Sequence, residues 1–177
     1  PGTQNGSLAS RFAYQFTNKI LPLADFCMDF HTGGGSRFNV AQIRVDPDKE
    51  ELMQYAKLFG APFIVYSKNI SKSYRSTCEK MNIPVLLFEG GKSQISDKDI
   101  ARAGVHGVMR ILSHFKMLSK DFEAPQQSKD SITIKSSSWL RAKYSGLLHL
   151  KSTCGDFVEK NEVIATITDP YGTFRHK

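Results

Sequence analysis

Two ionisable residues, each followed by glycines, are the strongest chemical signals in the sequence. His31 follows the apolar segment 24–30, and Glu89 follows the apolar segment 84–88. A neutral imidazole is a common zinc ligand, and a carboxylate at the end of a strand can serve as a general base. Taken singly, His31 is equally consistent with a structural role in a glycine turn, and Glu89 with an exposed turn acid.

Polar neighbours could complete a site around these two residues. Asp29 and His31 are two positions apart, so on a strand they point to the same side, and Asp29 could hold the imidazole in one tautomer. Arg37, Arg44 and Arg75 lie in or near the expected strand-end loops. A guanidinium binds carboxylates through a bidentate fork, although any one of these arginines could equally be an ordinary surface residue.

Local motifs exclude several other chemistries. The sequence has no HExxH, HxH or HxxE pattern, so a complete metal site cannot be assembled from local motifs. It also has no GxSxG nucleophile elbow, and the glycines after His31 lack the flanking pattern of a dinucleotide fingerprint or a phosphate-binding loop.

Helix and strand patterns alternate through the first 118 residues. Apolar residues at helical spacing, with capping residues at the ends, predict helices over 7–20, 46–59, 71–82 and 96–118. Short apolar runs predict strands over 24–30, 62–66 and 84–88. This alternation predicts an α/β fold with parallel strands. The two strand-end residues should then meet at one sheet edge, where open α/β sheets bind ligands.

The last third of the chain has a different character. Residues 119–130 are polar and contain a proline, so we expect a linker there. No helical stripe remains after it, and strand-like segments alternate with turns such as 169–172. Residues 131–177 should therefore form a small all-β module. It ends just after a turn that ought to lead into another strand.

Composition excludes several classes of protein. The 177 residues carry a formal charge of +7, but Lys and Arg are scattered, so no nucleic-acid-binding face is expected. No apolar run approaches the roughly 18 residues of a membrane span. The three cysteines are far apart, which favours a reduced, cytoplasmic setting. Because the chain opens with Pro1 rather than Met, the natural N-terminus is expected to lie outside it.

Six segments in order form a recognisable pattern: a D-x-H-T strand end, an R-x-N-x-x-Q-x-R block, an S-Y-R turn, a second strand end, a G-V-x-G-V helix and a G-D-x-V-x-K turn. They are residues 24–34, 37–44, 73–75, 84–91, 104–108 and 155–160. Together these segments resemble the succinylglutamate desuccinylase/aspartoacylase family, a branch of the zinc carboxypeptidase-like hydrolases.

The resemblance implies a fold. It implies a zinc-carboxypeptidase-like sheet flanked by helices in a catalytic domain at residues 1–118, followed by a small C-terminal all-β module. In this family a His and a Glu of an H-G-x-E motif bind zinc together with a second His from the D-x-H strand end. Since this sequence has no H-G-x-E, the chain is expected to be an internal piece of a longer protein, with both domains truncated.

The resemblance also implies an activity, the zinc-dependent hydrolysis of the amide bond of an N-acyl amino acid. It implies that His31 is a zinc ligand, that Glu89 is the general base, and that Arg75 holds a substrate carboxylate. Further substrate contacts are expected from Arg37, Asn39 and Arg44. With a single protein ligand, the chain alone should bind zinc poorly and be inactive.

Other functions remain open. One is a non-catalytic binding module that keeps the fold without metal. A carrier role of the β module would need a lysine at a hairpin tip in a modifiable motif, and Lys160-Asn161 lacks that context. For the hydrolase, the expected partner is a small anionic N-acyl amino acid, without nucleic acid or membrane, and the sequence is compatible with a homo-oligomer.

Overall fold

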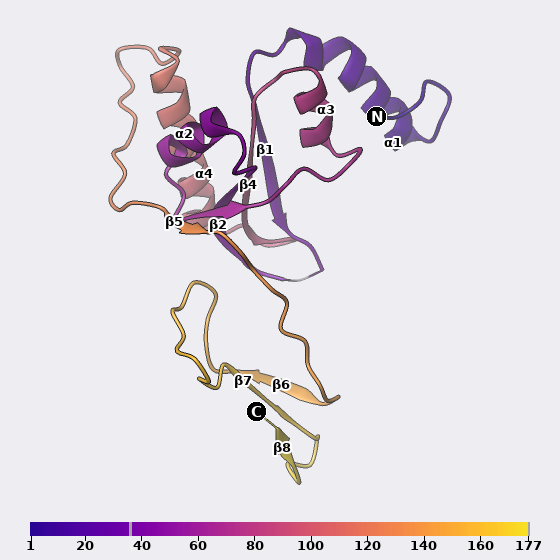
Figure 1. Ribbon diagram of the computed structural model, residues 1–177, viewed down its shortest axis with the longest axis vertical. Coiled ribbons are helices and arrows are strands. Elements are labelled where there is room, and N and C mark those ends of the chain that lie inside the picture. Colours follow the sequence, from indigo (N-terminus) through magenta and orange to yellow (C-terminus); the bar gives the residue numbers. More distant parts are fainter. Residues whose placement is uncertain (36, 177) are drawn as a thin grey trace. The chain divides into compact units, whose positions relative to one another are not determined.

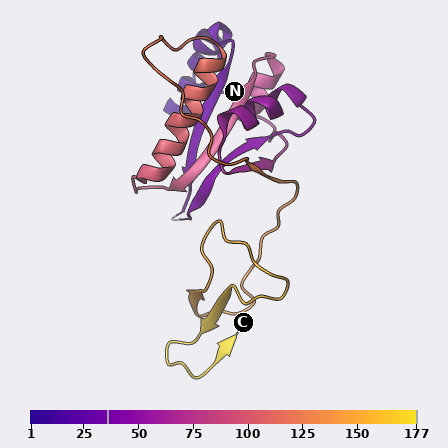
Figure 2. The same cartoon turned by 90° about the vertical axis from the view of Figure 1, so that its left-hand side faces the viewer.

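The computed structural model describes residues 1–35 and 37–176 and divides into two compact units, Pro1–Ser136 and Ser137–Lys177. The first unit is a sheet with helices on both faces, and the second is a small antiparallel sheet (Figures 1 and 2). Along the described ranges, no helix combines the length and the apolar content that a membrane crossing requires.

A five-stranded sheet forms the centre of the first unit, in the order β1-β4-β2-β3-β5. Its strands are β1 (Cys27–Gly33), β2 (Asn39–Val45), β3 (Phe63–Tyr66), β4 (Val85–Lys92) and β5 (Ile132–Ile134). β4 pairs in parallel with β1, and β2 and β5 both pair in parallel with β3. Only the pair between β2 and β4 is antiparallel among these strands, so the sheet is mainly parallel.

Four α-helices flank this sheet: α1 (Leu8–Gln15), α2 (Glu50–Phe59), α3 (Tyr74–Lys80) and α4 (Lys98–His114). Side-chain caps fix where three of them begin. Ser7 and Ser73 each accept a backbone N–H in the first turn of α1 and α3, and Asp97 accepts two at the start of α4. A π-helical turn (Phe16–Ile20) and a 3₁₀ turn (Leu21–Leu23) continue α1 towards β1.

One face of the sheet carries the main hydrophobic core beneath α2 and α4 (Figure 1). Ile43, Ile64 and Leu86 are fully buried in this core. Phe59 of α2 packs directly against Gly107 of α4, where a Cβ atom would collide with the phenyl ring. Only glycine allows the two helices to approach this closely, and we call this sheet surface the core face.

The opposite face is apolar at one end and polar at the other. Leu21, Cys78 and Val85 belong to a small buried cluster that packs beneath α3. Further along the same strands, Asp29 and Glu89 occupy this face, because their positions alternate with those of core residues. We call this surface the polar face.

The structure corrects two strand predictions. Residues 39–45 were not expected to form a strand, yet they form β2 and separate β3 from β4. Because β2 runs antiparallel to β4, the strand at 63–66 ends at the opposite edge from β1 and β4. The helix expected from residue 46 begins at Glu50, since Asp46 instead accepts the backbone N–H of Asp48 in a turn.

The boundary of the second unit also differs from the expected one. Residues 132–134, expected within the β module, form β5 of the first sheet, and the unit boundary lies between residues 136 and 137. Ser131 Oγ donates to the carbonyl of Ala61 at 2.6 Å and so anchors this short strand. The expected linker at 119–130 is tied to α4, because Arg110 donates to the carbonyl of Pro125 at 2.9 Å.

The second unit confirms the expected antiparallel β structure. Its sheet has the order β6-β7-β8, formed by β6 (Leu147–Leu150), β7 (Ala165–Thr168) and β8 (Arg175–His176). The turn before β8 is fixed by Asp169, which accepts bonds from the backbone and hydroxyl of Thr173. Within the strand-like segment 139–151, residues 147–150 form β6.

Candidate functional site

His31 and Glu89 lie directly opposite each other on neighbouring strands, as the strand-end argument predicted. They are paired in the parallel register of β1 and β4, so their side chains share the polar face. The chain then turns back tightly after β1. A Cβ atom at Gly33 would collide with the carbonyl oxygen of Arg37, so this return requires glycine.

A carboxylate orients the imidazole of His31. Asp29 Oδ2 lies 3.0 Å from His31 Nε2, and the imidazole remains half exposed. Because Nε2 faces Asp29, Nδ1 is the nitrogen available to an external partner. A carboxylate behind a histidine in this way fixes the tautomer and makes the other nitrogen a better metal ligand.

An amide and a guanidinium from β2 approach the carboxylate of Glu89. Asn39 Nδ2 donates to Glu89 Oε2 at 3.0 Å. Arg44 Nε lies 3.3 Å from the same oxygen, although it is not aligned for a hydrogen bond. The side chain of Glu89 is only 16% exposed, so its charge is largely shielded from water and is balanced by Arg44.

Arg75 is buried next to this group, with 7% of its surface exposed. It lies in the first turn of α3 and donates to the carbonyl and hydroxyl oxygens of Ser67, both at 3.3 Å. Burial lowers the pKa of Arg75 and the charge of Arg44 lowers it further, whereas the carboxylate of Glu89 opposes this shift. A guanidinium nevertheless stays protonated at neutral pH, so two fixed cations stand beside the carboxylate.

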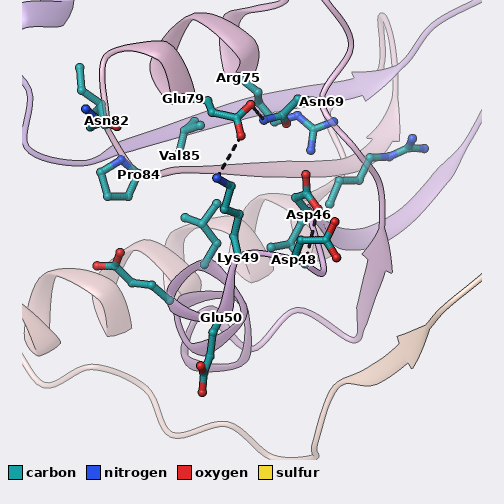
Figure 3. Close-up of a pocket in the computed structure, with 15 residues that line it drawn as sticks. Asp46, Asp48, Lys49, Glu50, Asn69, Arg75, Glu79, Asn82, Pro84 and Val85 are labelled. Atoms are coloured by element: carbon teal, nitrogen blue, oxygen red, sulfur yellow. Dashed lines mark hydrogen bonds and ion pairs between the residues drawn. The ribbon is translucent and has the colours of Figure 1, made fainter.

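A cavity of about 400 Å³ opens beside the two arginines (Figure 3). Arg44 and Arg75 line it together with charged residues of the β2–α2 loop and of α3. Glu79 contacts two other residues that line this cavity. Lys49 Nζ lies 3.2 Å from one of its carboxylate oxygens, and Asn69 Nδ2 donates to the other at 2.9 Å. These two partners lower the pKa of Glu79 and keep it ionised.

Comparison with known proteins identifies the family behind this geometry. Residues 2–115 match the model of the succinylglutamate desuccinylase/aspartoacylase catalytic domain. The chain belongs to the succinylglutamate desuccinylase/aspartoacylase family. The matched residues contain all of the side chains described above, from Asp29 to Glu89, and exclude the second unit.

A curated protein also resembles the chain over nearly its whole length. A curated relative, the N-alpha-acetyl-L-2,4-diaminobutyric acid deacetylase of Halomonas elongata, is 23% identical over 96% of this chain and 52% of the relative. The chain therefore spans about half the length of this relative.

Solved structures of the family show the same fold. The apo ectoine utilization protein EutE (DoeB) of Ruegeria pomeroyi superposes with a TM-score of 0.83, at 21% identity over 99% of this chain and 58% of that protein. A succinylglutamate desuccinylase/aspartoacylase of Rhodobacter sphaeroides gives 0.82, at 22% identity over 98% and 55%. At these identities the likeness concerns the fold alone.

A desuccinylase/aspartoacylase site with zinc needs more ligands than the described residues supply. Within residues 1–35 and 37–176, no three His, Cys, Asp or Glu side chains lie close enough to hold a metal ion. Catalytic zinc usually takes about three protein ligands and a water. His31, oriented by Asp29, fits one of these positions, and the rest of the set is not present in this part of the chain.

The structure brings most of the predicted site residues together. Asn39 and Arg44 contact Glu89, and Arg75 lies beside them. Arg37 donates from Nε to the carbonyl of Gly34 at 3.1 Å, within the loop between β1 and β2. Sequence reasoning missed the contacts of β2 with Glu89. The alternation of polar and apolar residues in N-V-A-Q-I-R-V, typical of a strand, was the signal that could have revealed them.

Proposed function

We propose that the protein hydrolyses the amide bond of an N-acyl amino acid, with zinc as cofactor. The observation that carries the proposal is the pairing of His31 with Glu89 on adjacent strands, with Asp29 behind the imidazole and two arginines beside the carboxylate. A relative of the same family is named as an N-acyl amino acid deacetylase, which supports this reaction class.

In this proposal Glu89 is the general base. Its carboxylate takes a proton from the attacking water and later passes it to the leaving amine. His31 contributes Nδ1 as one zinc ligand. Asp29, by its contact with Nε2, keeps Nδ1 unprotonated and orients the imidazole so that Nδ1 faces the metal. Zinc, when bound, polarises the scissile carbonyl and lowers the pKa of a bound water to about 7.

The arginines bind the substrate rather than react with it. Arg75 and Arg44 lie beside Glu89, where their guanidinium groups suit a carboxylate of a small anionic substrate. Holding that carboxylate fixes the position of the amide relative to the base, which lowers the entropic part of the barrier. Arg37, in the loop that follows His31, stays a predicted substrate contact.

A second candidate function is a binding module that keeps the fold without metal. The incomplete ligand set of the described residues favours it. Such a module would bind an N-acyl amino acid at the arginines without turnover. For either function we place the protein in the cytoplasm, in keeping with the wide separation of its three cysteines in the sequence.

The test is an assay of the full-length protein on a panel of N-acetyl and N-succinyl amino acids, with zinc measured on the same samples. We expect hydrolysis that a chelator abolishes and added zinc restores. Saturable binding of the same compounds without product, in protein that lacks zinc, would instead establish the binding module. Residues 1–177 alone should bind zinc weakly. Tight, stoichiometric zinc binding by these residues would contradict the hypothesis that they supply His31 as a single ligand.

A further inference from the structure

Asn39 and Arg44 both approach one oxygen of Glu89 and leave the other open. The amide Nδ2 and the guanidinium Nε lie 3.0 and 3.3 Å from Oε2. Among the residues that the structure describes, none donates to Oε1. The carboxylate is thus held from one side, and its free oxygen is the one that can accept a proton from a substrate water.

The register of β2 explains why these two residues reach the same carboxylate. In the antiparallel pair with β4, Asn39 lies opposite Gly91 and Arg44 opposite Leu87, so they bracket the position of Glu89. Gln42 lies directly opposite Glu89. The register shifts between Asn39 and Gln42, where β2 carries an extra residue. An odd spacing would otherwise place the two residues on opposite faces, and this bulge returns Asn39 to the polar face.

We propose that Asn39 and Arg44 are positioning residues that hold Glu89 by Oε2 and so direct Oε1 at the reacting water. This inference rests on the proposed function, in which Glu89 is the base. It assigns Asn39 to the base instead of the substrate. Arg44 serves both the base and the substrate, because its Nε faces Glu89 and its charge lies close to Arg75, the other arginine proposed to bind the substrate carboxylate.

Holding the carboxylate matters because glutamate is flexible. An ordered Glu side chain loses rotamer freedom, and the amide of Asn39 and the charge of Arg44, both fixed on a strand, provide the opposing interaction. When the carboxylate moves away from the reacting water, the reaction slows, and a misplacement of about 1 Å can lower the rate roughly 100-fold. Loss of the Asn39 donor should therefore act on the turnover number and much less on substrate affinity.

The sharpest test compares two substitutions of Asn39 in the full-length protein. Asn39→Ala removes the donor and should lower kcat about 10-fold with little change in KM. Asn39→Asp is nearly isosteric but places a second carboxylate against Oε2, so it should lower kcat further than alanine does. If Asn39 only filled space, the isosteric aspartate would be the milder change, and that order would overturn the proposal.

Arg44 and Gln42 provide the matched comparisons. Arg44→Gln should lower kcat and also raise KM, because it affects both the base and the binding of the substrate carboxylate. Arg44→Lys should recover part of the loss through its charge. Gln42→Ala removes a neighbour that faces Glu89 in the register but has no described contact with it, so it should stay within about 2-fold of the parent.

A second measurement separates this inference from the proposed function. Carbon-13 relaxation of the Glu89 side chain, assigned with Glu89→Gln, should show an ordered carboxylate in the parent and in Gln42→Ala, and a mobile one in Asn39→Ala. An ordered Glu89 in a protein that hydrolyses nothing would refute the proposed function while the holding contact stands. Full turnover in both Asn39 variants, or equal mobility of Glu89 in all proteins, would refute the positioning role.

Discussion

The two faces of the central sheet are built from the same strands but have different roles: one packs in the core and the other carries the candidate site. On the core face, Phe30 and Phe88 pack against each other with ring centroids 5.5 Å apart. On the polar face, the residues that follow each of them, His31 and Glu89, form the candidate site. Because side chains alternate along a strand, one segment supplies residues both to the packed core and to the candidate site on the opposite face.

The difference between the faces depends on how far the helices cover them. α2 and α4 cover the core face, whereas α3 covers only the part of the polar face around Val85. Beyond the part of the strands that α3 covers, the residues on this face are polar, starting with Asp29 on β1 and Glu89 on β4. This arrangement predicts that changes on one face alter activity and changes on the other alter stability.

The largest effect is expected from Glu89→Gln on the polar face. The substitution keeps the shape of the side chain but removes the base, which typically costs about 10²–10⁴-fold in rate. Zinc content and the midpoint of thermal unfolding should not change, and both are measured beside kcat on the best substrate. A variant that keeps full turnover would show that another group is the base.

The next effect is expected from Phe59→Ala on the core face. Phe59 is fully buried between the sheet and α4, so its truncation should lower the free energy of unfolding by about 3–5 kcal/mol. Denaturant titration measures this loss. The rate per folded molecule at low temperature should match the parent, and a selective loss of rate would contradict the division between the faces.

A smaller effect is expected from Asp29→Asn. The amide can still pack beside His31, but it no longer fixes the imidazole with Nδ1 free, so zinc affinity should fall about 10–100-fold. Competition with a chromogenic chelator measures this change in the full-length protein. Unchanged affinity would mean that His31 is not a ligand, or that Asp29 does not orient it.

The smallest effect is expected at the rim of the cavity. Lys68 and Asp48 form an ion pair at 3.3 Å, but both side chains are at least 70% exposed. Lys68→Ala should therefore change the free energy of unfolding by about 1 kcal/mol at most. A larger loss of stability, or a loss of rate, would show that the loop around Lys68 supports Arg75 through this pair.

The sequence was sufficient to predict the main features of the first unit. The apolar runs before His31 and Glu89 located β1 and β4, and the strand-end argument correctly predicted that these residues meet. Helices were predicted within a few residues, and Gly60 ends α2 in the left-handed conformation expected of a C-cap.

Other features depended on contacts that no local pattern encodes. β2 follows a glycine-rich turn, and its seven residues were not predicted as a strand. Its antiparallel direction is set by pairing with a distant strand. β5 has only three residues and is defined by its partner β3. The contact of Asn39 with Glu89 depends in addition on a one-residue bulge, whose position sequence periodicity does not reveal.

The central position of β4 has a consequence for how the protein folds. β4 pairs with both β1 and β2, and it is made after both of them as the chain grows from its N-terminus. Asp29 and His31 on one side, and Asn39 and Arg44 on the other, therefore stay separate until β4 inserts between their strands. Glu89 arrives on β4, so the pairing of β1, β4 and β2 and the assembly of the site are completed in the same step.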